Sequence, residues 1–404
     1  MKLFYALFFL PLLASAEVPN TFINGQVAGA NEVNENFSAL AEQISALPST
    51  FPSGWDGGKV LTEVDCSTDE LALKTFLDRS NTSPNANVLV SIRGRCRGGF
   101  FLENQIVGLI AHPGERFSLF TDESDTAPAV AGTAYGGYLY LDGADIEQGP
   151  NTTHGILAYM GGIAFVYNTT VDYIEPSNIG FQSGMGALRG STIEVVGSAS
   201  ISSNVHGVYL DSGAVFRIED GSDFSISAGA LGVYARRGSV IADISSAFNI
   251  TGTDKAVRLY EGSVWSRDFS EGSLSLTGDV LIENSSSFID PVLGNSPITQ
   301  NSGTLTVNSS QFSAVADVGS INANRADINL TAITTVPSVV AVDSRITLIP
   351  PENYTQSLSV GLTNTALEYG ATGADTAGIS CQGYSSIRAG VTLLLTNKET
   401  STCE

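Results

Sequence analysis

The sequence of 404 residues predicts a single-stranded parallel β-helix, a solenoid in which short strands stack one coil upon the next. Three observations predict it. A short pattern recurs between residues 137 and 265, apolar and polar residues alternate inside each copy, and no helical period separates the copies. A repeat of this size cannot bury its apolar face alone, whereas stacked copies share a continuous core.

The recurring pattern starts with glycine or alanine and runs through five residues to a second glycine and a small residue. The copies lie roughly 18 to 29 residues apart, a period typical of solenoid repeats. They are Gly137–Gly143, Gly155–Gly161, Gly184–Gly190, Gly207–Gly213, Gly232–Gly238 and Ala256–Gly262. Residues one and three places after the first glycine are mostly apolar, so they share one face of a strand. The second glycine indicates a tight turn that needs a positive φ or a close approach.

Charge and composition restrict the partners. Lys and Arg together number 19 and Asp and Glu 41, which gives a net charge of −22. This balance opposes non-specific binding to nucleic acid and favours solubility, saline surroundings or cation binding. Apolar residues make up 43% of the chain and glycine numbers 42, which suits a turn-rich, all-β, secreted protein. We therefore expect no nucleic-acid partner.

The first residues have the pattern of a secretory signal. Lys2 precedes an apolar run from Leu3 to Leu13, and Ala14 to Ala16 form a cleavage motif. We expect residues 1–16 to be removed near Ala16 and the remainder to be secreted. The apolar run is too short to cross a membrane, and no later run is long enough, so we expect no membrane span.

Residues 17–58 are expected to form a leader helix and a linker before the solenoid, which takes residues 59–404. Apolar residues within 31–47 recur at spacings of four and three, as in a coiled-coil seam. They are Val33, Phe37, Leu40, Ile44 and Leu47. This short run leaves two interpretations open: a helix that lies on the end of the solenoid, or a coil that joins copies into a homo-oligomer. Residues 48–58, rich in Pro and Gly, are interpreted as a linker.

Two stretches resemble known proteins. Residues 20–40 resemble the leader of many secreted or fibre-like bacterial proteins. Between residues 60 and 110, a cysteine, a capping box, a short helix, a strand and a second cysteine follow one another. The residues concerned are Cys66, Ser67 to Glu70, Leu73, Phe76, Leu77, Val88, Val90, Ile92 and Cys96, with the helix ending near Arg79. This order resembles the N-terminal cap of bacterial right-handed β-helix proteins of the pectin-lyase-like superfamily.

The resemblance implies a right-handed coil and a cap over residues 60–100. It also implies a Cys66–Cys96 disulfide that pins the cap helix over the open end of the core, where an exposed strand edge would invite aggregation. A metal site is the alternative for these cysteines. At the other end, the strand pattern weakens after residue 265, and Cys381 and Cys403 suggest a second disulfide that closes the last coil, 381–404.

The outward columns of the repeat hold the candidate binding residues. If the coils stack in register, tyrosines and arginines line up on one outer face, with acidic and basic neighbours. We name these residues the candidate ladder: Tyr209, Tyr234, Arg236, Arg258, Arg189, Asp211, Lys255 and His206. Aromatic faces beside arginine and aspartate are what a sugar ring needs. Stacked side chains that only stabilise the sheet surface are the alternative.

Two functional hypotheses follow. The first is a secreted binding or structural, adhesin-like protein that recognises glycan or cell-surface polysaccharide without catalysis. The second is a polysaccharide lyase of the pectin-lyase-like superfamily that cleaves an acidic glycan by β-elimination. That reaction needs a cation beside the carboxylate and a base for the α-proton. Lys255, Arg258 or Arg236 could supply the cation, and His206, Tyr234 or Lys255 the base. The adjacent Asp-Asp of polygalacturonase-like hydrolases is absent, which argues against that family.

No cofactor is expected. The three histidines, His112, His154 and His206, are expected on separate coils, in loop or surface positions rather than at a metal. Acidic turns at 122–125 and 219–223 could hold Ca²⁺, although solvated loops are the more economical interpretation.

Overall fold

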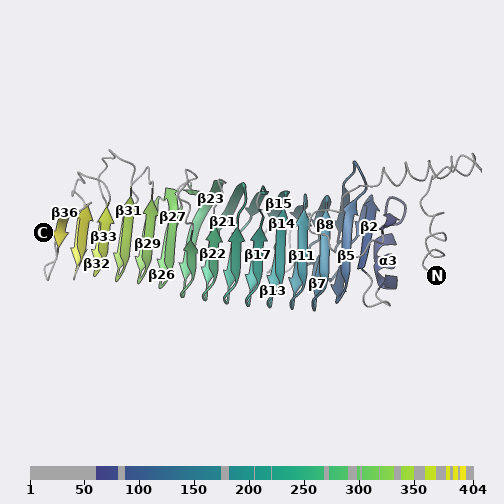
Figure 1. Cartoon of the computed structure of the whole chain (residues 1–404), viewed down its shortest axis with the longest axis horizontal. Coiled ribbons are helices and arrows are strands. Elements are labelled where there is room, and N and C mark those ends of the chain that lie inside the picture. Colours follow the sequence, from purple (N-terminus) through teal and green to yellow (C-terminus); the bar gives the residue numbers. More distant parts are fainter. Residues whose placement is uncertain are drawn as a thin grey trace, which may run out of the picture.

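The computed structural model describes residues 61–80, 87–173, 182–203, 205–219, 221–267, 273–289, 298–300, 303–317, 319–331, 338–349, 360–369, 379–382, 385–389 and 392–396. Within these ranges the chain is a parallel β-solenoid of about ten turns, with a single α-helix at its N-terminal end (Figure 1). The predicted parallel β-helix is confirmed. In the same ranges, no helix has the length and apolar character needed to cross a membrane.

Three parallel sheets form the walls of the solenoid. Sheet 1 consists of β1 (Leu61–Asp65), β2 (Asn87–Arg93), β5 (Ile106–Ala111), β8 (Tyr138–Asp142), β11 (Ile163–Tyr167), β14 (Thr192–Val196), β17 (Val215–Ile218), β20 (Val240–Asp243), β22 (Val264–Arg267), β24 (Ser287–Ile289), β27 (Gln311–Asp317), β29 (Asp327–Thr331), β31 (Arg345–Ile349), β33 (Ala366–Tyr369), β35 (Ser386–Ala389) and β36 (Thr392–Thr396). Sheet 2 consists of β3 (Arg95–Arg97), β6 (Phe117–Phe120), β9 (Ala144–Gln148), β12 (Thr170–Tyr173), β15 (Ser198–Ser203), β18 (Asp223–Ala228), the first parts of β21 (Ala247–Tyr260) and β23 (Ser273–Glu283), and β25 (Ile298–Gln300). Sheet 3 consists of β4 (Phe100–Glu103), β7 (Ala129–Ala134), β10 (His154–Tyr159), β13 (Ser183–Leu188), β16 (His206–Asp211), β19 (Leu231–Arg236), the second parts of β21 and β23, β26 (Thr304–Asn308), β28 (Ser320–Asn324), β30 (Ser338–Val342), β32 (Val360–Thr363) and β34 (Ile379–Gln382).

The wall formed by sheet 2 ends before the C-terminus. β25 pairs with the far end of β27, and the described coils beyond it contribute strands to sheets 1 and 3. The cross-section therefore changes from three strands per coil to two. Pairing stays parallel as far as β35, whose last partner, β36, is antiparallel.

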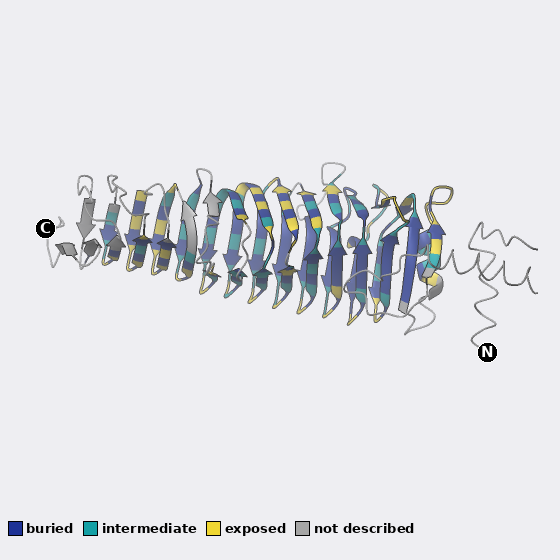
Figure 2. Cartoon of the chain, turned by 45° about the horizontal axis from the view of Figure 1, so that its top comes forward, coloured by how far each residue is buried: buried dark blue, intermediate teal, exposed yellow. Residues whose placement is uncertain are grey.

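The inward columns of sheet 3 match the predicted alternation. Ile156, Met185, Val208, Val233 and Val257 pair in one register column and are at most 1% exposed. Residues at the turns are more exposed than the strands that they join (Figure 2). The core is thus one continuous stack of inward side chains, as expected from a solenoid.

The first glycine of the repeat is required by close packing. A Cβ on Gly207 would stand 2.1 Å from the Ile226 side chain and 2.6 Å from the carbonyl oxygen of Gly232. Gly184 and Gly232 are crowded in the same way by an isoleucine of sheet 2. Only a residue without a side chain lets sheets 2 and 3 approach so closely.

The turn between sheets 3 and 1 keeps the same backbone on successive coils. As far as Asn284 and Ser285, two residues in a row have positive φ, for example Arg237 at 55° and Gly238 at 70°. In the later coils one residue keeps it: Ser309, Arg325, Asp343 and Asn364. The small residue that follows is buried, and its hydroxyl bonds to backbone, as Ser263 does to the Tyr260 carbonyl at 2.8 Å. This buried column comprises Ser191, Ala214, Ser239, Ser263, Ser286, Ser310, Ala326, Ser344, Thr365 and Ser385. The repeat that fades in the sequence after residue 265 therefore persists at this turn.

One copy of the predicted repeat is misplaced. Gly137–Gly143 contains β8, which pairs with β5 and β11 in sheet 1, whereas the other copies lie in sheet 3. The sheet 3 strand of that coil is β7, which pairs with β10. Apolar side chains on both faces of β8 and the positive φ of Gly143 imitate the pattern of a sheet 3 strand.

The N-terminal cap contains the helix α3 (Ala72–Ser80), which buries Leu73 and Leu77 against the core. The Cys66–Cys96 disulfide joins the segment before this helix to β3, as the resemblance implied. The predicted capping box is wrong. Asp69 accepts the backbone N–H of Leu71 at 3.0 Å, because the helix begins later than the box requires.

Several predicted segments lie outside the described residues. They are the signal at 1–16, the leader at 17–58 with its helix at 31–47, and Cys403, so a Cys381–Cys403 bond stays a prediction.

Candidate functional site

The register of sheet 3 brings part of the candidate ladder together. Tyr209 on β16 pairs with Tyr234 on β19, which pairs with Arg258 on β21. The two tyrosine rings are 5.6 Å apart, and the His206 ring lies 6.0 Å and 5.8 Å from them. These four side chains form one outward cluster over three coils.

A second column lies beside the first. Asp211 pairs with Arg236, which pairs with Tyr260. The Arg236 guanidinium is 5.4 Å from the centre of the Tyr209 ring and 6.0 Å from that of Tyr234. The Arg258 guanidinium is 5.3 Å from the Tyr234 ring and 5.5 Å from the Tyr260 ring. Guanidinium groups and rings therefore alternate across the surface, an arrangement that cation–π attraction stabilises.

Carboxylates compensate the positive charge of this cluster. Asp211 accepts from Arg236 at 2.9 Å and from Arg237 at 3.3 Å. Arg258 pairs with Glu283 at 3.4 Å, and Lys255 with Asp254 at 3.2 Å. Sequence reasoning missed Glu283, which follows Ile282, the register partner of Leu259. Only the register could have revealed it.

Exposure separates contact residues from supporting ones. Tyr209 is 5% exposed, whereas the side chain of Arg258 is 34% exposed and Tyr234 and Tyr260 are half-buried. Tyr209 therefore lies against the neighbours that support the surface, while Tyr234, Tyr260 and Arg258 are open to a ligand.

Burial sets the protonation states within the cluster. It raises the pKa of Tyr209 to about 12, with a further contribution from the Asp211 carboxylate. It lowers the pKa of His206 to about 4. At neutral pH the phenol is therefore protonated and the imidazole uncharged.

Two members of the candidate ladder lie away from its centre. Arg189 is in the turn after β13, with its guanidinium 5.2 Å from the Tyr159 ring. Lys255 occupies the column of His206 and Leu231 and pairs with its own neighbour, Asp254. The structure therefore keeps Arg189 apart from the tyrosine pair and places Lys255 at its margin.

The three histidines lie on separate coils, as predicted, with His154 on β10, His206 on β16 and His112 after β5. The expected loop or surface position is wrong for His154, because it stands at the start of a strand and is only 4% exposed. His154 is buried over Gly186 and lies 2.6 Å from the Ser183 hydroxyl. Burial lowers its pKa to about 3. His112 contacts Arg93 near the cap. Among the described residues, no group of three or more His, Cys, Asp or Glu side chains is placed to hold a metal ion.

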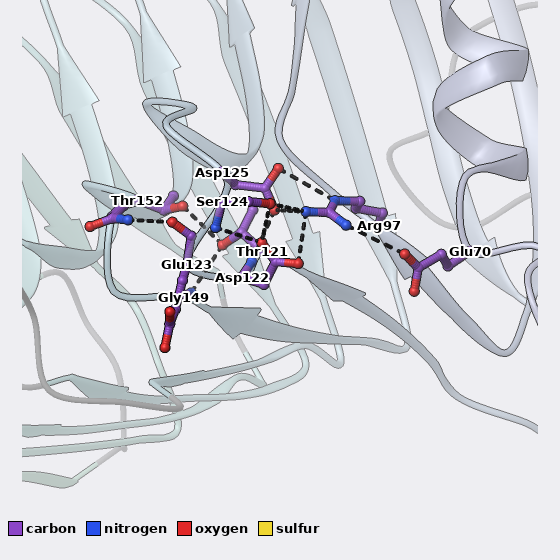
Figure 3. Close-up of polar contacts among 10 residues, drawn as sticks. Glu70, Arg97, Thr121, Asp122, Glu123, Ser124, Asp125, Gly149 and Thr152 are labelled. Carbon is purple, nitrogen blue, oxygen red and sulfur yellow. Dashed lines mark hydrogen bonds and ion pairs between the residues drawn. The ribbon is translucent and has the colours of Figure 1, made fainter.

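The acidic turn at 122–125 faces a guanidinium. Arg97 pairs with Asp122 at 2.7 Å, with Asp125 at 3.1 Å and with Glu70 at 3.4 Å (Figure 3). Asp122 also accepts from the Ser124 hydroxyl, which lowers the pKa of its carboxyl. These carboxylates therefore tie the loop after β6 to the cap, with Arg97 between them.

A polar groove of about 620 Å³ lies where sheet 1 turns into sheet 2, and sequence reasoning missed it. Its walls include the side chains of Asp142, Asn168, Thr170, Ser198, Ser200 and Ser225, which come from successive coils. Arg116 also lines the groove, and its guanidinium pairs with Asp145 at 2.6 Å. Burial raises the pKa of Asp142 to about 6. The groove offers hydroxyl, amide and carboxyl groups at the spacing of stacked strands.

Comparisons with protein-family models, with curated proteins and with solved structures find no match to this chain.

Proposed function

We propose that this chain is a secreted, non-catalytic binding protein that recognises glycan on the outer face of sheet 3. The proposal also holds that the coil is right-handed. It takes the protein to be a bacterial surface or fibre component that resembles the pectin-lyase-like superfamily. One observation carries it: Tyr234, Arg258 and Tyr260 form a half-exposed, alternating array on adjacent strands. Cation–π contacts and a salt bridge between these side chains and Glu283 fix their positions.

The chemistry of this array suits a sugar ring. Tyr234 and Tyr260 offer apolar ring faces to C–H groups. The Arg258 guanidinium donates hydrogen bonds to hydroxyl oxygens, and the Glu283 carboxylate accepts them. Because carboxylates compensate the cationic groups and the whole chain carries a charge of −22, the array favours a neutral glycan over a polyuronate.

The lyase hypothesis has less support. β-Elimination needs an uncompensated cation for the substrate carboxylate and a base with a pKa near the working pH. Arg236 and Arg258 are paired with acids, and the pKa of His206 is about 4. Lys255, proposed both as the cation and as a base, is itself paired with Asp254 at 3.2 Å. The cluster therefore offers the rings and hydrogen-bonding groups that sugar binding needs, whereas its compensated cations do not suit β-elimination.

The groove at Asp142 and Ser200 is a second candidate surface for the same ligand class. Its hydroxyl and amide groups are the partners that neutral sugars bind through hydrogen bonds. Its lining residues include no Tyr, Trp or Phe. The array on sheet 3 is therefore the first choice.

The leader is proposed to join copies of the chain. Its apolar seam within 31–47 would place several solenoids side by side, so that weak sugar contacts add in avidity. An oligomer that dissociates on deletion of residues 20–47 supports this part, and a monomeric intact chain refutes it.

The experiment pairs retention with product formation. The secreted chain is applied to columns of neutral glycans and of alginate, pectate and glycosaminoglycans, with and without Ca²⁺, while ultraviolet absorbance is followed in parallel solutions. Retention on a neutral glycan without absorbing product supports the proposal. A rising absorbance that Arg258→Ala removes would establish the lyase instead. Retention that survives Tyr234→Ala but is lost in Ser200→Leu would transfer binding to the groove.

A further inference from the structure

The outer face of sheet 2 carries a regular grid of short polar side chains. It spans β15, β18 and the first parts of β21 and β23, with three outward positions on each strand. Exposed and buried residues alternate along these strands, as on β18, and the strands appear banded when coloured by burial (Figure 2). We name the outward positions the hydroxyl grid: Ser198, Ser200, Ser202, Asp223, Ser225, Ser227, Ala247, Asn249, Thr251, Ser273, Ser275 and Thr277.

The grid is in register over all four strands. Ser202 pairs with Ser227, Ser227 with Thr251, and Thr251 with Thr277, and the other two columns are equally continuous. Neighbouring strands lie about 4.8 Å apart, and alternate residues of one strand about 6.7 Å apart. Three positions on each of four strands make twelve, of which nine are Ser or Thr. Hydroxyl groups therefore repeat in two directions at fixed spacings.

The inner face of the same strands fixes these spacings. Phe224 and Phe248 stack with centroids 5.1 Å apart, and both are at most 1% exposed. Ile226 packs so closely on Gly207 of sheet 3 that a Cβ there would stand 2.1 Å from its side chain. A core of this density does not let a single strand shift. The outer side chains consequently start from a rigid backbone.

The protein itself leaves the hydroxyls of the grid unused. Ser225, Ser227 and Thr251 are exposed, and within the described part of the chain their side chains form no hydrogen bond to another residue. One coil before the grid, by contrast, the Thr170 hydroxyl donates to Asp145 at 2.5 Å. The grid is therefore a bounded region of this wall whose polar groups all face outward.

The composition of the grid argues against most classes of ligand. In a chain of net charge −22 it has one charged residue, Asp223, at its edge. It contains no Lys or Arg for a phosphate or sulfate and no aromatic ring for the apolar face of a sugar. Its hydroxyls can rotate, and each both donates and accepts hydrogen bonds. They suit a partner that presents donors and acceptors at every position.

Periodicity restricts the partner further. A single exposed hydroxyl gains little from a ligand, because each new hydrogen bond replaces one to liquid water. Many contacts that form together add up without further loss of freedom, as in multivalent binding. That requires a partner whose own groups repeat at the spacings of the grid.

We propose that the hydroxyl grid binds the surface of an ice crystal. In ice every water molecule both donates and accepts, and the oxygen positions on its prism faces repeat at spacings close to those of the grid. A rigid array of this kind orders its first water layer in the pattern of the crystal, and these waters then bridge protein and ice. Protein fixed to a crystal face stops growth there. The proposal does not rest on glycan recognition, which uses another wall, sheet 3.

Thermal hysteresis, the gap between the melting and freezing temperatures of a single ice crystal, tests this assignment. The purified chain should produce a gap that grows with protein concentration. Ser227→Tyr places a ring in the grid, at a position that does not line the polar groove, and should reduce the gap several-fold at equal concentration. Asn322→Tyr is the matched control, since Asn322 is an exposed strand residue on sheet 3, and should leave the gap unchanged. Urea unfolding verifies that both variants are folded.

A second measurement uses the intact chain alone. Ice that grows slowly from a dilute solution excludes ordinary proteins, whereas this chain should enter the ice at several-fold higher concentration than an added protein without affinity for ice. Exclusion from the ice together with no hysteresis overturns the proposal. An equal loss of hysteresis in both variants overturns the assignment to sheet 2. Retention on crystalline cellulose or chitin that Ser227→Tyr abolishes, with exclusion from ice, also overturns it and assigns the grid to a crystalline polysaccharide.

Discussion

The carboxylate of Asp211 on β16 accepts a hydrogen bond of 2.9 Å from the guanidinium of Arg236, one coil further on β19. The same carboxylate also accepts from Arg237 at 3.3 Å. Asp211 therefore fixes two cations whose positions decide both the shape and the charge of the candidate surface.

Replacing this carboxylate should change the ligand preference. In Asp211→Asn, two guanidinium groups lose their charge partner, so the surface gains one positive charge. We expect new retention on pectate or alginate that is strong at low salt and disappears above about 0.5 M salt, where screening is short-ranged. Asp254→Asn is the control, because Asp254 pairs with Lys255 at the margin. Equal retention of both variants would show that retention depends on net charge alone and not on the position of Asp211.

The close approach of sheets 2 and 3 predicts a large effect at Gly207. In Gly207→Ala, the added Cβ would overlap the side chain of Ile226. We expect a loss of about 1–3 kcal/mol in the free energy of unfolding, measured with urea. The double variant Gly207→Ala/Ile226→Ala should be less destabilised than the sum of the two single variants. Simple additivity would mean that Gly207 is needed for another reason.

The buried hydroxyl column predicts a different pair of outcomes. The Ser263 hydroxyl donates to the Tyr260 carbonyl, and the column also contains Ala214 and Ala326. Ser263→Ala should therefore cost about 1 kcal/mol. Ser263→Val adds volume at a fully buried position and should cost more. A valine variant as stable as the alanine variant in urea would contradict this packing.

The buried histidines predict how stability depends on pH. The pKa of His206 is about 4 when folded and near 6.5 when unfolded. Between these values the unfolded chain binds more protons, so stability is complete above about pH 6.5 and falls towards pH 4. His154 contributes in the same direction. The pKa of Asp142, raised to about 6, has the opposite effect, since its folded form gains stability as the pH falls from 6.

Thermal unfolding at pH 7 and pH 5 measures this dependence. We expect the melting temperature of His206→Gln to fall less from pH 7 to pH 5 than that of the intact chain. The melting temperature of Asp142→Asn should fall more, because this variant removes the carboxyl whose protonation stabilises the folded chain at low pH. An unchanged difference in His206→Gln would show that this imidazole titrates alike in the folded and unfolded chains.

The sequence predicted the features that depend on one strand at a time. Alternation identified the inward residues, such as Val208 and Leu210, and the second glycine marked the turn. Which wall a strand joins was harder to predict. β8 has Tyr140 on one face and Leu141 on the other, and a strand that is apolar on both faces gives no sign of its sheet.

The candidate site was predictable only in part for a similar reason. Tyr209 and Tyr234 share a repeat position, so their alignment followed from the period. Their burial and charge partners did not. Glu283 lies one coil beyond Arg258, and its role depends on a register shift between β21 and β23 that no sequence pattern announces.

The most direct test of the proposed function compares two tyrosines on the same face of sheet 3. Tyr234 belongs to the array, whereas Tyr159 lies three coils away beside Arg189. On the neutral glycan that retains the chain best, calorimetry should show that Tyr234→Ala weakens binding by about 5- to 30-fold, or ~1–2 kcal/mol. Tyr159→Ala should leave the affinity unchanged. Equal affinities for both variants and the intact chain would contradict glycan recognition by this array.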